Sequence, residues 1–424
     1  MPPPLPALAA ILLAAAPGGG APGSRMKDLL VVGRIHTLDP ARPLAEALLV
    51  RAGRIACVGA ERECAGRATA DVVRIEAGSA VPGLVDAHGH VQGLGRSRRE
   101  VSCVGAATEE ACAALAGERA RRAPAGSWIL GRGWDQNRWS VARFPTQATL
   151  TRAAPDHPAM LVRVDGHACW VNARALALAG IGPGTPDPPG GRILRAPDGA
   201  PTGVLVDAAQ DLVRRKVPAP GPAEIEEEIL AGLRELAALG LTEVHDAGVP
   251  PESLDAYARL AAADRLPLRV YAMIDGQVPL RALEAELRRW KDRREVGRLT
   301  VRAVKLYADG ALGSRGAALH EDYADDPGNR GLLLTEPDAL RAKVRAIARA
   351  GLQPAVHAIG DRAVSIVVDA FEAAGDLRPL RPRVEHVQVV LQRDVPRLAA
   401  AGAIASMQPV HATSDAPWVA ARLG

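Results

Sequence analysis

Residues 81–90 form an apolar run, V-P-G-L-V-D-A-H-G-H, that ends in two histidines two residues apart. Alternate residues of a β-strand point to the same face, so His88 and His90 can converge on one cation if this run is a strand. Gly89 between them keeps the backbone uncrowded. The two histidines would supply half of a metal site. Two histidines near an aspartate also occur by chance at a polar strand end, so the pair alone does not establish the site.

Three further strand-like runs contain a residue that can bind a metal at or near their ends. Lys305 follows V-R-A-V, His357 follows L-Q-P-A-V, and His386 follows P-R-V-E. The chain has only 10 histidines, and four of them occupy such positions. A (β/α)8 barrel gathers its active site from the C-terminal ends of its parallel strands, so this recurrence predicts an α/β TIM barrel.

Strand-like and helix-like segments alternate after residue 83, which indicates parallel βα units. Seven strands are expected, at residues 83–90, 241–248, 268–274, 301–307, 352–357, 383–389 and 403–408. Helices are expected at residues 222–239, 252–263, 280–294, 336–350, 362–374 and 392–400. No eighth strand is visible in the sequence.

Taken together, several motifs resemble the amidohydrolase superfamily, and within it the amidohydrolase-3 group of YtcJ-like metal-dependent hydrolases. They are P-G-L-V-D-A-H-G-H, the Lys305 strand, H-A-I-G-D-R-A-V, V-E-H-V-Q and S-M-Q-P-V-H-A-T-S-D. The resemblance covers nearly everything after residue 26. It implies a TIM barrel with a small N-terminal β-sandwich, and a hydrolase that cleaves carbon–nitrogen bonds other than peptide bonds, such as an amide or an N-substituted formamide.

The resemblance also implies one or two divalent metal ions, usually zinc, that polarise a carbonyl group and activate water. His88 and His90 would hold one metal, and His357 and His386 the other, because imidazole is a good ligand for zinc. His245, at the end of another strand, is expected to support a ligand rather than to be one.

Lys305 would bridge the two metals. A lysine ammonium cannot bind a metal, but burial lowers its pKa, and the free amine can take up carbon dioxide to become an anionic carbamate with two oxygens. Alternatively, Lys305 is the structural ion-pair partner of a nearby aspartate such as Asp309.

The catalytic base stays unknown at this point. In the superfamily it is an aspartate at the end of the eighth strand, and the matching segment is not found here. Asp415, in H-A-T-S-D-A-P, imitates that motif but follows the seventh strand by one loop. We expect Asp415 to be a loop or N-cap residue that opens a helix from Pro417. We therefore expect an incomplete gene product whose activity is left open.

The N-terminal part is expected to be one portion of the small β-sandwich, over residues 26–82, with strands at 31–37, 47–50, 54–58 and in D-V-V-R-I-E-A-G. Residues 83–424 would then form the barrel domain. Residues 94–221 are too long for an ordinary loop, and we expect them to form an insertion subdomain.

Residues 1–25 allow two interpretations. Residues 5–16 are apolar, as in the core of a signal peptide, which would make the protein periplasmic or secreted, but no Lys or Arg precedes them. Alternatively, translation starts at Met26, where the resemblance begins, and the protein is cytoplasmic. The apolar stretch is too short to span a membrane.

Within the insertion, G-R-G-W-D-Q-N-R-W places Trp134 and Trp139 among polar residues, and D-G-H-A-C-W contains His167. We expect Trp134 and His167 to contact substrate. The alternative is that the tryptophans pack within the insertion and that His167 is a hydrogen-bonded core residue.

The amino-acid composition limits the kinds of binding partner that we expect. The formal charge of +4 is small beside 52 basic and 48 acidic residues, and no basic cluster is interleaved with aromatic residues, so nucleic-acid binding is not expected. Five scattered cysteines do not indicate a disulfide framework. The expected partner is a small-molecule substrate; neither a membrane nor a nucleic acid is expected, and a homodimer is compatible with the sequence.

Three hypotheses follow. The chain is a metal-dependent hydrolase of carbon–nitrogen bonds, or a metal-binding fragment that lacks its eighth-strand aspartate and does not turn over, or a barrel that serves as a non-catalytic scaffold.

Overall fold

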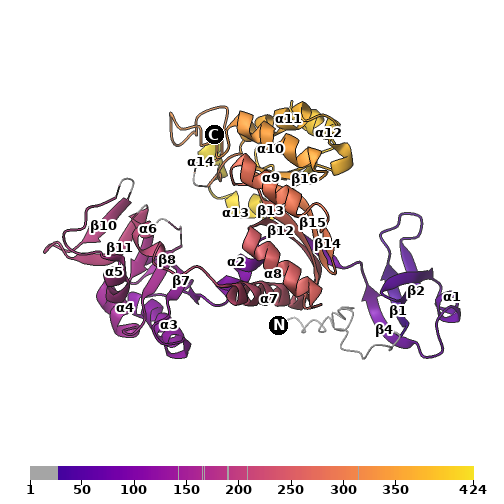
Figure 1. The fold of residues 1–424 in the computed structure, drawn as a ribbon, viewed down its shortest axis with the longest axis horizontal. Coiled ribbons are helices and arrows are strands. Elements are labelled where there is room, and N and C mark those ends of the chain that lie inside the picture. Colours follow the sequence, from indigo (N-terminus) through magenta and orange to yellow (C-terminus); the bar gives the residue numbers. More distant parts are fainter. Residues whose placement is uncertain are drawn as a thin grey trace. The chain divides into compact units, whose positions relative to one another are not determined.

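The computed structural model describes residues 27–424 except residues 142, 165, 167, 189, 190, 208 and 314. The two interpretations of residues 1–25 therefore lie outside the described residues. The chain divides into two compact units (Figure 1). The first consists of Met1–His90 with Leu233–Gly424, and the second of Val91–Gly232.

The main sheet of the first unit is parallel, and its strands run in the order of the chain. The strands are β5 (Leu84–Gly89), β12 (Leu241–Val249), β13 (Arg269–Asp275), β15 (Leu299–Tyr307), β16 (Gln353–Ala358), β17 (Arg383–His386) and β18 (Ile404–Ser406). A short strand, β14 (Glu295–Val296), pairs antiparallel with β15. All seven predicted strands are present, and the predicted TIM-barrel fold is confirmed.

Helices alternate with these strands as far as β18, as predicted, and two further helices follow β18. They are α7 (Pro222–Ala238), α8 (Pro251–Ala262), α9 (Leu280–Arg289), α10 (Pro337–Arg349), α11 (Asp361–Ala373), α12 (Val395–Ala400), α13 (Val410–Asp415) and α14 (Val419–Leu423). The sequence of α11 shows why its helix packs: the buried residues Val364, Val367, Val368 and Phe371 recur at helical spacing and form one apolar face. Helix α8 packs on β13 and β15, while α10 and α11 pack on β16.

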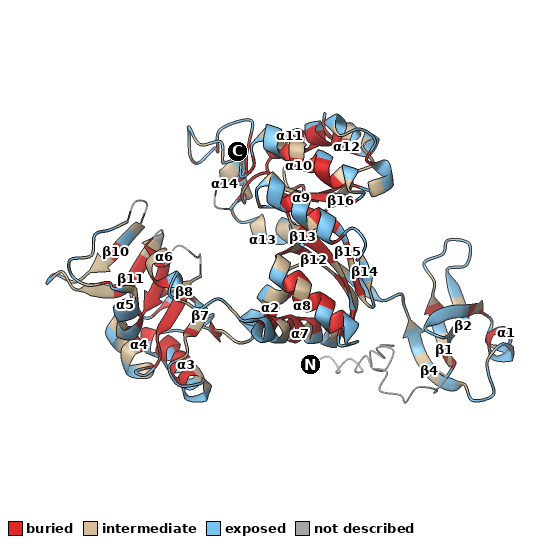
Figure 2. Cartoon of the chain, viewed as in Figure 1, coloured by how far each residue is buried: buried red, intermediate tan, exposed pale blue. Residues whose placement is uncertain are grey.

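A small buried cluster, mostly alanine, lies on four strands of the sheet. Ala247, Met273, Ala303 and Ala355 form one buried cluster. Ala303 and Lys305 are two residues apart on β15, and so are Ala355 and His357 on β16, so each pair faces the same side. The cluster therefore supports the face that carries Lys305 and His357. Figure 2 shows that buried residues concentrate on the strands and on the helix faces that contact them.

The N-terminal segment forms a four-stranded sheet. Its strands, β1 (Leu29–His36), β2 (Leu44–Arg51), β3 (Arg54–Gly59) and β4 (Val73–Ala80), lie in the order β3-β2-β1-β4. β1 pairs antiparallel with β2 and parallel with β4. A short helix, α1 (Glu61–Gly66), follows β3.

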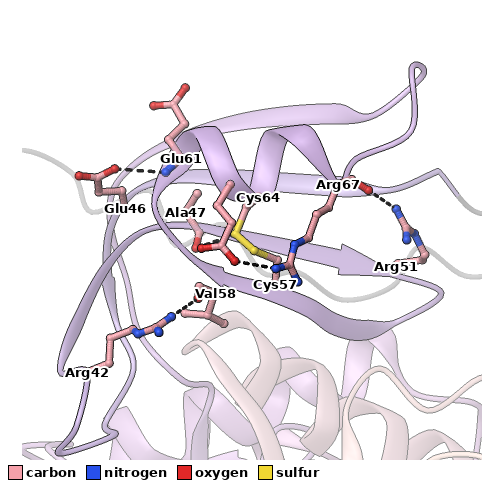
Figure 3. The surroundings of a disulfide bond; sticks show 10 residues. Arg42, Glu46, Ala47, Arg51, Cys57, Val58, Glu61, Cys64 and Arg67 are labelled. Atoms are coloured by element: carbon pink, nitrogen blue, oxygen red, sulfur yellow. Dashed lines mark hydrogen bonds and ion pairs between the residues drawn. A yellow bond between two sulfur atoms is a disulfide. The ribbon is translucent and has the colours of Figure 1, made fainter.

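A disulfide joins Cys57 of β3 to Cys64 of α1 (Figure 3). Hydrogen bonds surround it: Glu46 accepts one from the backbone N–H of Glu61 at 3.1 Å, and Arg42 donates to the carbonyl of Val58 at 2.7 Å (Figure 3). The expectation that the cysteines form no disulfide framework was wrong, because folding brings together cysteines from different elements.

The second unit contains a six-stranded sheet in the order β10-β11-β9-β8-β7-β6. The strands are β6 (Val101–Ser102), β7 (Ile129–Trp134), β8 (Ala159–Arg163), β9 (Ala168–Val171), β10 (Gly191–Arg195) and β11 (Pro201–Asp207). The α-helices of this unit that precede α7 are α2 (Val91–Ser97), α3 (Glu109–Arg122), α4 (Gln147–Ala153), α5 (Ala173–Ala179) and α6 (Gln210–Arg214). A second disulfide joins Cys103 to Cys112 of α3, and Cys169 is free and buried.

Across the described residues, every helix is too short or too polar to cross a membrane.

Candidate metal centre

The ends of four parallel strands bring the predicted metal ligands together in the first unit. His88 and His90 come from the end of β5, Lys305 from β15, His357 from β16 and His386 from β17. Ring centroids are 5.5 Å apart for His88 and His90, and 4.7 Å apart both for His88 and His386 and for His357 and His386. The sequence order of the strands therefore predicted which side chains would meet.

Three of the histidines donate a hydrogen bond through Nδ1. The acceptors are Oε2 of Glu385 for His88 at 2.6 Å, the carbonyl of Ala247 for His90 at 3.0 Å, and Oε1 of Gln408 for His386 at 2.6 Å. A carboxylate, a carbonyl and an amide oxygen can only accept, so Nδ1 carries the proton in each ring. This leaves the lone pair of Nε2 for a metal.

His357 is held through its other nitrogen. Its Nε2 lies 3.2 Å from the carbonyl oxygen of Gly310 and 3.4 Å from Oδ1 of Asp309. With the proton on Nε2, Nδ1 keeps the lone pair. All four rings thus have one nitrogen oriented by an oxygen acceptor and one nitrogen that can bind a metal, which is the usual arrangement of histidine ligands.

Burial keeps two of these rings neutral. It lowers the pKa of His90, with help from the nearby charges of His88 and Lys305. Burial also lowers the pKa of His386 to about 3, and His357 and Lys305 contribute in the same direction. The neutral imidazole is the form that binds a metal, so these shifts favour metal binding at neutral pH.

Lys305 is buried, with 1% of its surface exposed, and burial lowers its pKa to about 8. Its Nζ lies 4.7 Å from the ring centroid of Tyr307.

The alternative ion pair with Asp309 is not formed among the described residues. The carboxylate of Asp309 instead accepts hydrogen bonds from the backbone N–H groups of Ala318, Ile359 and Gly360, at 2.9, 3.0 and 2.8 Å. Lys305 is therefore left as a buried amine, and the carbamate stays a prediction.

Glu385, which orients His88, is fully buried beside Arg383. Burial would raise its pKa, but the hydrogen bonds from His88 and Arg383 outweigh this and hold the pKa at about 2. His245 lies on the far side of Arg383, with its Nδ1 at 2.9 Å from Nη1 of that arginine. His245 thus contacts Arg383, which binds Glu385, and its role in supporting a ligand stays a prediction.

The donor set has the chemistry of a metal site without a preformed ligand geometry. In the part of the chain that the structure describes, no three His, Cys, Asp or Glu side chains are arranged to hold a metal ion between them. The rings of His88, His386 and His357 instead pack edge to face. Four available imidazole nitrogens and one buried amine nevertheless fit a zinc-like cation.

Asp415 has a different structural role from the one expected. It is the last residue of α13 rather than the cap of a helix that starts at Pro417. Its carboxylate accepts hydrogen bonds from Gln388 at 2.8 Å and from the hydroxyl of Ser414 at 2.7 Å. The observed helix therefore starts at Val410 and ends before Pro417, where a helix start was expected.

A pocket of about 250 Å³ lies beside His88. Its lining comes from two segments, residues 86–88 of β5 and residues 406–410 at and after β18. His411 follows directly, and its ring centroid is 5.9 Å from that of His386. The pocket therefore borders one of the candidate ligands, His88.

Of the two residues predicted to contact substrate, His167 lies outside the described residues. Trp134 has no exposed surface, and its indole N–H donates to the carbonyl of Leu161 at 2.7 Å. Trp134 and Trp139 both belong to a buried apolar cluster of the second unit. The structure thus corrects the expectation for Trp134: it packs in a core, as the alternative had it, because its ring is covered by neighbouring strands.

Sequence reasoning missed the residues that orient the ligands, chiefly Arg383, Glu385 and Gln408. A signal existed for one pair, since Arg383 and Glu385 are two residues apart on one strand and so face the same side. Buried charges need paired and hydrogen-bonded partners, so such a pair predicts a polar network on that side of the strand.

Known proteins resemble this chain over most of its length. The model of a family described as "Amidohydrolase family" matches residues 76–424. YtcJ of Bacillus subtilis (strain 168) is 32% identical over 412 residues, which cover 94% of this chain and 76% of that protein. An N-substituted formamide deformylase of Arthrobacter pascens is 31% identical over 363 residues, covering 82% of this chain and 66% of that protein.

Solved structures agree. A metal-dependent hydrolase from Pyrococcus furiosus superposes with a TM-score of 0.78 at 27% identity, over 94% of this chain and 80% of that one. A metal-dependent hydrolase from Pyrococcus horikoshii gives the same TM-score at 25% identity, over 94% and 78% of the two chains.

Proposed function

Because this chain belongs to the amidohydrolase family, we propose that it binds one or two divalent metal ions, most readily zinc, and hydrolyses a carbon–nitrogen bond other than a peptide bond. The observation that carries the proposal is the set of four histidines at strand ends, each with one ring nitrogen engaged by an oxygen acceptor and the other left to bind a metal. Metal-dependent hydrolases use such ligands.

His88, His90, His357 and His386 would hold the metal through the nitrogens identified above. A bound divalent metal supplies Lewis-acid polarisation of the substrate carbonyl and lowers the pKa of water. The protein's own contribution is to orient the rings before the metal arrives, which Glu385, Gln408 and the carbonyl of Ala247 do, while burial favours the neutral form of His90 and His386.

Lys305 is proposed to become a carbamate. Its neutral amine attacks the carbon of carbon dioxide, a nitrogen–carbon bond forms, and one proton leaves, which yields an anion with two oxygens. A pKa of about 8 makes the neutral amine more abundant at neutral pH than that of an ordinary lysine. Burial without an ion pair among the described residues supports this role.

The proposed substrate class is an amide or an N-substituted formamide. The relative from Arthrobacter pascens is named for deformylation of N-substituted formamides, and the pocket beside His88 has a volume suited to a small group.

Elemental analysis of the purified protein tests the proposal. We expect about two zinc ions per chain in the wild type, loss of bound metal in His88→Ala, and retention in His320→Ala, which changes a histidine that donates no ligand here. Lys305→Met should lose metal, whereas Lys305→Glu, which keeps an anionic oxygen donor, should retain part of it. Unchanged metal content in both His88→Ala and Lys305→Met would contradict the assignment.

A second candidate is metal binding without turnover. It is favoured by one observation: three carboxylates near the candidate ligands are already engaged, Glu385 with His88 and Arg383, Asp309 with backbone N–H groups, and Asp415 with Gln388. Hydrolysis of N-substituted formamides by the metal-loaded protein distinguishes the two candidates. Bound metal with no hydrolysis of any amide would favour the second.

A further inference from the structure

Arg383 is buried near the candidate site and makes five hydrogen bonds there. Only 4% of its surface is exposed. Its Nε donates to Oε1 of Glu385 at 2.7 Å, and its Nη2 lies 3.0 Å from Oε2 of the same carboxylate. Its Nη2 also donates to the carbonyl of Ala87 at 2.7 Å and to the hydroxyl of Ser406 at 2.8 Å, and its Nη1 lies 2.9 Å from Nδ1 of His245.

These partners lie on four strands. Glu385 is on β17 with Arg383 itself, Ser406 is on the neighbouring β18, His245 is on β12, and Ala87 is on β5. β12 and β5 are not hydrogen-bonded neighbours of β17 in the sheet order. The guanidinium therefore reaches across the inside of the sheet and connects its last strands to its first.

His88 is held by Arg383 in two ways. Through the side chain, Arg383 fixes Glu385, whose Oε2 accepts the hydrogen bond from Nδ1 of His88 at 2.6 Å. Through the backbone, Arg383 binds the carbonyl of Ala87, the residue before His88. A ligand whose backbone and ring are both anchored presents its free nitrogen in one direction.

We propose that Arg383 is the positioning residue of the metal centre, and that it sets the direction in which His88 presents Nε2 to the metal. The inference rests on the proposed function, because it presupposes a metal at His88. A planar guanidinium with five donors can serve Glu385, Ala87, Ser406 and His245 together, whereas the three-donor ammonium of a lysine cannot reproduce this geometry. Removing a partner that orients a ligand typically weakens metal binding 10- to 100-fold.

The test compares Arg383→Lys, Arg383→Met and Glu385→Gln with Arg397→Met as a matched control. Arg397 also binds several carboxylates, those of Asp369, Glu372 and Asp394. Asp369 and Glu372 lie on α11, and Asp394 immediately precedes α12, the helix that contains Arg397. Three quantities are measured: the dissociation constant for zinc, the visible absorption spectrum of the cobalt-loaded protein, and the free energy of unfolding of the metal-free protein.

We expect both Arg383 variants and Glu385→Gln to bind zinc about 10- to 100-fold more weakly and to change the cobalt spectrum. Arg397→Met should lower the free energy of unfolding while zinc affinity and the cobalt spectrum stay as in the wild type. A purely structural role would move only the free energy of unfolding.

Wild-type zinc affinity and an unchanged cobalt spectrum in a folded Arg383→Lys protein would overturn the inference and leave the proposed function standing. A wild-type protein that binds no metal would overturn both. If Arg383→Met does not fold, Arg383→Lys and Glu385→Gln, which conserve size, decide the outcome.

Discussion

Lys305 links function to stability at the scale of a single residue. Burial lowers its pKa from 10.5 to about 8. Between these two values the unfolded chain binds a proton that the folded chain does not, so the free energy of unfolding rises with pH across this window. Below pH 8 the folded protein must bury an ammonium ion, which costs stability.

Lys305→Met should therefore stabilise the metal-free protein at pH 7 by about 1–3 kcal/mol, because an apolar side chain replaces a buried charge. It should also remove the rise in stability between pH 8 and 10.5. Urea unfolding at pH 7 and pH 10 with a chelator present measures both effects. A variant that keeps the wild-type dependence on pH would show that Lys305 is not the titrating group.

His386 and Glu385 make the metal-free protein sensitive to acid. The folded-state pKa of His386 is about 3, against about 6.5 in an unfolded chain. That of Glu385 is about 2, against 4.5. In both cases the unfolded chain binds more protons, so stability falls as the pH drops below 6.5 and falls more steeply below 4.5.

His386→Gln should flatten this loss of stability between pH 6.5 and pH 4.5. Thermal unfolding at half-unit pH steps with a chelator provides the measurement. Equal acid sensitivity in the wild type and in His386→Gln would contradict the assignment.

The five candidate ligands could be predicted at the residue scale because each lies at or near the end of a strand-like run, and parallel strands end together. Their orienting partners could not. The carbonyl of Ala247 has no sequence signature, and Gln408 meets His386 only through the pairing of β17 with β18. Trp134 was predicted to contact substrate because its sequence neighbours are polar. These neighbours do not show that folding buries its ring.

At the scale of elements, the start of α11 depends on a close contact. A Cβ atom on Gly360 would lie 2.1 Å from the carbonyl oxygen of Ala318, and the backbone N–H of Gly360 also binds Asp309. Gly360→Ala should destabilise the protein by about 2–3 kcal/mol, because the loop must shift to relieve the overlap.

Gly221→Ala is the matched control, since Gly221 also precedes a helix but would place its Cβ in open space. It should change stability by less than about 0.5 kcal/mol. Chemical unfolding of the two variants makes the comparison. If Gly360→Ala were as stable as Gly221→Ala, the segment around Ala318 would move aside without a loss of stability.

The two disulfides tie neighbouring elements together, and they give a direct chemical prediction. Denatured, unreduced protein should show one reactive thiol per chain, that of Cys169, and reduction should raise the number to five. A thiol titration with a chromogenic disulfide reagent measures both values. Five reactive thiols before reduction, in protein isolated with its thiols protected from air, would show that neither bond forms.

Strands and helices could be predicted from the sequence because apolar periodicity and helix-ending glycines mark them locally. The disulfides could not, since Cys57 and Cys64 lie on a strand and a helix whose packing is set by the fold. The segment around Asp415 was mispredicted for a related reason: its helix ends at Asp415, where the sequence resembles a helix start.

At the scale of the whole molecule, the candidate ligands and the tryptophans are unevenly divided. All five candidate ligands belong to the first unit. Four of the six tryptophans, Trp128, Trp134, Trp139 and Trp170, belong to the second. Tryptophan fluorescence therefore reports mainly on the second unit, while circular dichroism reports on both.

Each unit has its own sheet and its own buried clusters, so we expect two thermal transitions rather than one. Zinc at 100 times its dissociation constant should stabilise the first unit by about 2.7 kcal/mol. It should raise the transition of the first unit, which is seen mainly by circular dichroism, and leave the main fluorescence transition in place. A reductant breaks the Cys57–Cys64 bond of the first unit as well as the Cys103–Cys112 bond of the second, so it should lower both transitions. If zinc raised both transitions equally, the units would unfold as one cooperative body, and metal binding in the first would stabilise the second as well.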